Sequence, residues 1–148
     1  MRSVPPFPTD ALEIVAWPDE VIDLVGHDPH ADYVERYWLG VLGPSTTWLL
    51  RHLAAELSRR PDGFSLDLED CARRLGVGMR GGRQSPFVRA LGRLVQFEMA
   101  QLQGPSTLAV RTKVPDLSRR HLLRLPESLQ RQHDQWLTSR LAPIGSGS

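Results

Sequence analysis

The sequence SPFVRALGRLVQFEM at residues 85–99 has the pattern of one amphipathic helix. Ser85 can accept a hydrogen bond from a free amide of the first turn, and Pro86 suits the first helical position, where no backbone donor is needed. Apolar residues recur at helical spacing and predict an inward stripe of Phe87, Val88, Leu91, Leu94, Val95 and Met99. The opposite face carries Arg89, Arg93 and Gln96. Such a face suits a DNA groove, and it is equally the pattern of an ordinary solvated face.

The composition is typical of a globular protein with one core. The chain has 148 residues, of which 41% are hydrophobic and 24% charged. No apolar run approaches the ~20 residues that a membrane-spanning helix needs, and the start MRSVPPFPTD lacks the apolar stretch of a secretory signal. A single cysteine excludes an internal disulfide bond. We therefore expect a cytoplasmic protein without membrane association.

Charge is distributed unevenly along the chain. Residues 1–40 hold eight acidic and two basic side chains, whereas residues 80–124 hold nine basic and two acidic ones. The regional net charges are therefore −6 and +7 within a total of +1. Such an asymmetry favours contact of the basic region with an anionic partner, or coverage of the basic region by the acidic one.

Breaks in the hydrophobic pattern predict an α+β, mainly α-helical protein. We expect helices from Asp28, over 45–60, from Asp67 and from Ser85, with a short strand at 64–66 and a β-hairpin at 100–102 and 108–114. Residues 12–16 and 21–25 predict short strand elements. The expected organisation is an acidic N-terminal extension with a terminal arm (1–27), a main domain (28–125), a C-terminal docking or dimerisation helix (126–144) and a cloning linker (145–148).

The order of elements over residues 29–115 resembles the winged helix-turn-helix family. The AxxLGV run from Ala72 to Val77, the capped helix from Ser85 and the hairpin after Met99 carry the resemblance. The resemblance implies that helix 85–98 enters the major groove of DNA and that the 100–114 wing contacts the backbone. The turn GVGMRGGRQ is longer than the three or four residues usual between the paired helices. A looser likeness, in YWLGVLGP at 37–44 and the helix after it, is to winged-helix domains of bacterial primosomal and replication-initiation proteins.

The expected function is sequence-specific binding of double-stranded DNA by a bacterial transcriptional regulator, with homodimer formation through the last helix. Arginine can pair with guanine and glutamine with adenine, while hydroxyl, amide and cationic groups can hold phosphates. The candidate DNA-binding residues are Arg80, Arg83, Gln84, Ser85, Arg89, Arg93, Gln96, Arg111, Lys113, Arg119 and Arg120. The alternative is a protein-interaction adaptor, for example in a replication or plasmid-maintenance assembly, that binds a protein partner through its aromatic N-terminal helices.

Two further sequence motifs have the residue types of a dinucleotide-binding site and of a metal site, but they lack the secondary structure that such sites need. Gly76-x-Gly78-x-x-Gly81 matches a dinucleotide fingerprint, yet it follows a predicted helix and not a strand. His27, Asp28, His30 and Asp32 are metal-ligand types, although Asp28-Pro29 is explained as a helix start. Cys71 falls on the inner face of its predicted helix, as a small buried hydrophobe does. We therefore expect no enzyme activity, no cofactor and no metal.

Overall fold

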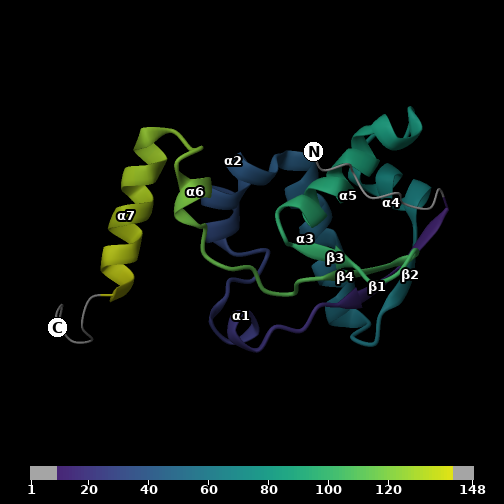
Figure 1. The fold of residues 1–148 in the computed structure, drawn as a ribbon, viewed down its shortest axis with the longest axis horizontal. Coiled ribbons are helices and arrows are strands. Elements are labelled where there is room, and N and C mark those ends of the chain that lie inside the picture. Colours follow the sequence, from purple (N-terminus) through teal and green to yellow (C-terminus); the bar gives the residue numbers. More distant parts are fainter. Residues whose placement is uncertain (1–9, 142–148) are drawn as a thin grey trace.

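A four-stranded sheet with the strand order β2-β1-β4-β3 organises the fold (Figure 1). The computed structural model describes residues 10–141. Strand β1 is antiparallel to β2 and parallel to β4, and β3 and β4 form an antiparallel hairpin. The strands are β1 (Ala11–Ala16), β2 (Phe64–Asp67), β3 (Ala100–Leu102) and β4 (Thr107–Val110). The protein is α+β and mainly helical, as the sequence predicts.

Helices surround the sheet and extend beyond one end of it. They are α1 (Glu20–Val25), the π-helix η1 (Val34–Trp38), α2 (Leu39–Leu42), α3 (Pro44–Arg59), α4 (Leu68–Leu75), the 3-10 helix η2 (Gly82–Gln84), α5 (Pro86–Gln96), α6 (Arg119–Leu122) and α7 (Glu127–Leu141). Figure 1 shows α3, α4 and α5 beside the strands, with α6 and α7 at the far end. No helix of the described part is long and apolar enough to cross a membrane.

Strand β1 lies inside the sheet although it comes from the acidic N-terminal region. Ile14 is opposite Phe64 of β2 and Leu108 of β4, and all three side chains are buried. The sequence predicts residues 1–27 as an extension outside the main domain. This is wrong for residues 11–16, because β1 lies between β2 and the β3–β4 hairpin in the sheet. Residues 1–9, which include most of the expected arm, lie outside the described part.

The predicted inward stripe of α5 is confirmed. Phe87, Leu91 and Leu94 have no exposed surface, and they belong to the same core as Leu49 and Leu53 of α3. Helix α5 packs against α3 along its length and against β3 at its end. This packing fixes which side of α5 faces outward.

Local capping signals place several helix starts where the sequence predicts them. The Asp67 carboxylate accepts a hydrogen bond from the Asp70 amide at 2.8 Å, and the Ser85 hydroxyl accepts one from the Val88 amide at 3.2 Å. Residues 21–25 differ from the prediction, because the Asp19 carboxylate caps them as helix α1.

Two predicted boundaries also differ from the structure. Asp28 accepts a hydrogen bond from the amide of His30 in a turn, so the helical segment starts only at Asp32 and its π-helical part at Val34. The second hairpin strand ends at Val110, and Val114 forms an isolated bridge with His27.

Helix α7 docks on its own protomer through one aromatic cluster. His133 is the only buried residue of α7, and its Nε2 lies 2.8 Å from the Tyr33 hydroxyl, which also accepts a hydrogen bond from the Leu117 amide. Arg140 donates to Asp116 at 2.9 Å, and the Trp136 ring lies 4.8 Å from that of Tyr33. The docking role expected for this helix is seen within one protomer. Residues 142–148, with the expected linker, lie outside the described part.

Candidate nucleic-acid interface

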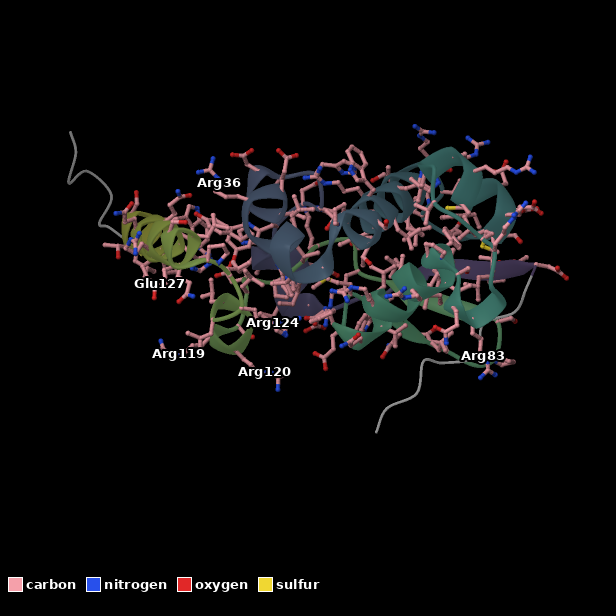
Figure 2. All side chains as sticks on the ribbon, turned by 90° about the horizontal axis from the view of Figure 1, so that it is seen from above. Arg36, Arg83, Arg119, Arg120, Arg124 and Glu127 are labelled. Atoms are coloured by element: carbon pink, nitrogen blue, oxygen red, sulfur yellow. The ribbon has the colours of Figure 1, made fainter. Side chains whose placement is uncertain are left out.

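The beginning of α5 presents a group of cationic side chains that have no carboxylate partner. Arg80, Arg83 and Arg89 are exposed, and none of them forms an ion pair within residues 10–141. By contrast, Arg74 on α4 is paired with Asp70 at 2.7 Å. Figure 2 shows Arg83 extending from the surface. These three guanidinium groups are therefore available to an anionic partner.

The turn before α5 positions this group. Gly81 has φ 104° and Gly82 has φ 57°, so two successive residues adopt the left-handed backbone that favours glycine. The amide of Phe87 then donates to the carbonyl of Gly78 at 2.9 Å, which ties the turn to the helix start. Gln84 lies between them, exposed, at the end of η2. The turn thus brings Arg80, Arg83 and Gln84 to the same end of α5 as Arg89.

Arg93, in contrast, is committed to the fold. Its Nε donates to the Leu42 carbonyl at 2.9 Å and its Nη2 to the Val41 carbonyl at 2.7 Å. These are among the last carbonyls of α2, which ends at Gly43 and has no further helical donors for them. The expected base-reading role of Arg93 is therefore not what its geometry favours, because two of its nitrogens cap another helix.

Ser85 and Gln96 mark the two ends of the same helix. Ser85 is fully buried and its hydroxyl caps α5, so its predicted contact with a phosphate is wrong. Gln96 is exposed at the last residue of α5 and keeps its amide at the surface. Of the residues predicted on the outer face of the helix, Arg89 and Gln96 are therefore exposed to a partner. Arg93 is half-buried, and two of its nitrogens are bound to carbonyls.

The hairpin provides fewer cations than the sequence suggests. Arg111 is only 9% exposed: its Nε donates to the Glu98 carbonyl at 2.7 Å, its Nη1 donates to Asp19 at 3.0 Å, and its guanidinium lies 3.9 Å from the Trp17 ring centre. The Ile22 amide and the Arg111 guanidinium lower the pKa of Asp19. The predicted DNA contact of Arg111 is therefore wrong, because this side chain is buried in the fold. Lys113 is half-exposed beyond the end of β4.

Helix α6 forms a second basic surface. Arg119, Arg120 and Arg124 are exposed, and none of them has an ion-pair partner in the described part of the chain. Figure 2 shows Arg119 and Arg120 extending from the same side of the molecule as Arg83, with Arg36 on the opposite side. Burial, and then the charges of Arg120 and Arg124, lower the pKa of His121 between them.

Phe97, at the C-terminal end of α5, contacts residues of both α5 and the α6 region. The guanidinium of Arg93 lies 5.4 Å from the centre of its ring, and that of Arg124 lies 5.6 Å from it. The His121 ring meets the same phenyl ring edge-on at 5.4 Å. The end of α5 is therefore adjacent to α6. The sequence allows Arg124 a phosphate contact beside Arg119 and Arg120, but its proximity to α5 depends on how the chain returns after the hairpin.

The other strings do not assemble into sites. No group of three metal-ligating side chains is found in residues 10–141. His27 instead pairs with Asp116 at 2.5 Å and stacks on Tyr33. Gly76 ends α4 in a left-handed conformation and is not preceded by a strand, so the glycine string has no dinucleotide-binding context. Cys71 is buried, and this burial raises the pKa of its thiol to about 12.

The surface defined by these contacts has two parts, which we call the α5 patch (Arg80, Arg83, Gln84 and Arg89) and the α6 patch (Arg119, Arg120 and Arg124). Both consist of long cationic or amide side chains over a rigid core, and such side chains suit an anionic polymer. No protein-family model, curated protein or solved structure matches this chain.

Proposed function

We propose that this protein binds double-stranded DNA through the α5 patch and acts as a cytoplasmic transcriptional regulator. The observation that carries the proposal is the group of three unpaired arginines, Arg80, Arg83 and Arg89, at one end of a rigidly packed helix. Arginine can contact the O6/N7 edge of guanine with two hydrogen bonds, and each good pair contributes about 1–3 kcal/mol of discrimination. The neighbouring Gln84 can serve adenine in the same way.

The order of elements supports a winged helix-turn-helix assignment for this region. Helix α3, strand β2, helices α4 and α5, and the β3–β4 hairpin follow one another as in the family that the sequence resembles. In that arrangement α5 is the recognition helix. The hairpin turn over 103–106 has no charged residue and Arg111 is buried, so we assign the backbone-contacting role to the α6 patch together with Lys113.

A titration of labelled random duplex DNA at two salt concentrations tests the proposal. Contacts to about five phosphates predict that log K falls with log salt concentration with a slope of about −4 to −5. Absence of binding at low salt, or binding that does not respond to salt, would reject DNA as the partner. A preferred site selected from a random library would then separate sequence-specific from general binding.

A protein-interaction adaptor is the second candidate function, and helix α1 favours it. Val21, Leu24 and Val25 are 67%, 84% and 55% exposed, so this short helix presents an apolar surface beside Glu20 and Asp23. Exposed apolar patches of this kind occur at protein contacts. Substitution of Leu24 with serine should leave DNA binding unchanged under the first proposal. Loss of function in the cell with intact DNA binding would favour the adaptor.

A further inference from the structure

A cavity lies between the start of α3 and the outer face of α5. Its volume is about 230 Å³, and it is lined by residues 42–46 on one side and by Pro86, Arg89, Ala90 and Arg93 on the other. No acidic side chain lines it. The cavity is thus bounded by two helices, and all of its charged groups are cationic.

The start of α3 contributes free backbone donors. Pro44 occupies the first helical position, and the amide of Thr47 makes the first hydrogen bond of the helix, to the Gly43 carbonyl at 3.0 Å. The amides of Ser45 and Thr46 therefore precede this bond, and neither has an acceptor among the described residues. They lie at the positive end of a 16-residue helix, where an anion is favoured.

Thr46 provides an independent observation that points to a ligand. Its side chain is only 1% exposed and lines the cavity, yet its hydroxyl makes no hydrogen bond within residues 10–141. The adjacent Thr47 differs, because its hydroxyl donates to the Gly43 carbonyl at 2.8 Å. Thr46 Oγ1 is not among the fully buried polar atoms that lack a partner in the described part of the chain, so this hydroxyl is an accessible and unused donor on the wall of the cavity.

Helix α5 contributes the charge. Arg89 has no carboxylate partner in the described residues, whereas Arg93 is held in place by its bonds to the Val41 and Leu42 carbonyls. Those two bonds use Nε and Nη2, and Nη1 of Arg93 stays without a partner in the described part of the chain. One unpaired guanidinium and one held by backbone carbonyls thus line the cavity together with the amides and the hydroxyl.

We infer that this cavity binds a phosphate group. Two amides, the Thr46 hydroxyl and two guanidinium groups match the several acceptor oxygens of a phosphate. The phosphate can belong to the DNA backbone or to a free phosphorylated compound. The first source rests on the proposed function, and the second does not. In the first case the cavity fixes the register of α5 on the duplex, because a backbone contact positions the protein without reading sequence.

The test uses the ¹⁵N-labelled full chain and inorganic phosphate at constant ionic strength, with chloride as the balancing anion. We expect the amide resonances of Ser45 and Thr46 to shift and to saturate. Thr46→Val keeps the shape of the side chain without the hydroxyl, and it should weaken phosphate binding about tenfold. Arg89→Ala should weaken it at least as much, and Arg36→Ala should leave it unchanged, because Arg36 does not line the cavity and is paired with Asp32.

A second arm of the test distinguishes the sources. If a short DNA duplex shifts the same amide resonances, and if inorganic phosphate reverses these shifts by competition, the ligand is the DNA backbone. Phosphate binding without any response to the duplex supports the cavity and identifies a free phosphorylated compound, while the DNA proposal fails. Unmoved Ser45 and Thr46 amides, or equal phosphate binding by wild type and Thr46→Val, would overturn the inference whatever the α5 patch does with DNA.

Discussion

Replacement of Arg111 with leucine should destabilise the protein without weakening DNA binding. The guanidinium donates to the Glu98 carbonyl at 2.7 Å, and a hydrogen bond from a charged donor contributes about 1.5–3 kcal/mol. Its position 3.9 Å from the Trp17 ring centre adds about 1 kcal/mol. The free energy of unfolding should therefore fall by about 3 kcal/mol, and the melting temperature by about 6–12 °C.

The assay for this prediction is urea denaturation followed by Trp fluorescence, together with duplex binding measured well below the melting temperature. Lys113→Leu is the matched control, because Lys113 is half-exposed nearby and its substitution should change stability by no more than about 0.5 kcal/mol. If Arg111→Leu kept the stability of the wild type and weakened DNA binding, Arg111 would be a DNA contact of the hairpin and its structural assignment would be refuted.

Three other predictions concern the fold and the arginines of α5. Deletion of residues 1–27 should abolish cooperative unfolding, because β1 lies between β2 and β4; a folded variant that binds DNA more tightly would instead show that the acidic region only masks the basic one. Burial lowers the pKa of His133, so stability should fall as the pH drops below about 6.5, where the unfolded chain takes up the proton more readily. His133→Gln should make the free energy of unfolding less dependent on pH in this range. If chemical denaturation gave the same pH profile for the variant and the wild type, the pH dependence would belong to other groups, such as His121. Arg93→Ala should lower stability by about 1–3 kcal/mol through two lost carbonyl caps, whereas Arg89→Ala should weaken DNA binding and leave stability unchanged; equal unfolding midpoints would contradict this difference.

Local signals in the sequence predict much of the fold. Asp67 and Ser85 cap the helices that follow them, and the apolar spacing after Ser85 identifies the buried face of α5. These features depend on residues within one or two turns of each other. Helix α1 was predicted as a strand, because a short apolar run does not distinguish a strand from a helix. The capping residue Asp19 is the local signal that indicates a helix there.

Long-range pairing could not be predicted in the same way. Strand β1 is parallel to β4, and Glu13 is opposite Thr107, more than ninety residues later in the chain. Nothing in the local sequence pattern indicates that partner. The roles of Arg93 and Arg111 fail for the same reason. Helical spacing and strand alternation place both side chains outward, but the carbonyls of Val41, Leu42 and Glu98 that bind them come from other parts of the chain.

The most direct test of DNA binding through the α5 patch is the salt dependence of duplex affinity for two matched triple variants. The first replaces Arg80, Arg83 and Arg89 with alanine. The second replaces Arg36, Arg59 and Arg131, exposed arginines that are each paired with a carboxylate of their own helical segment. If the three arginines also neutralise phosphates beside the bases that they contact, the first variant should reduce the steepness of the log K against log salt plot by about 3, and the second variant should leave it close to that of the wild type. Equal slopes for the two variants would contradict the assignment of the DNA-binding surface to α5.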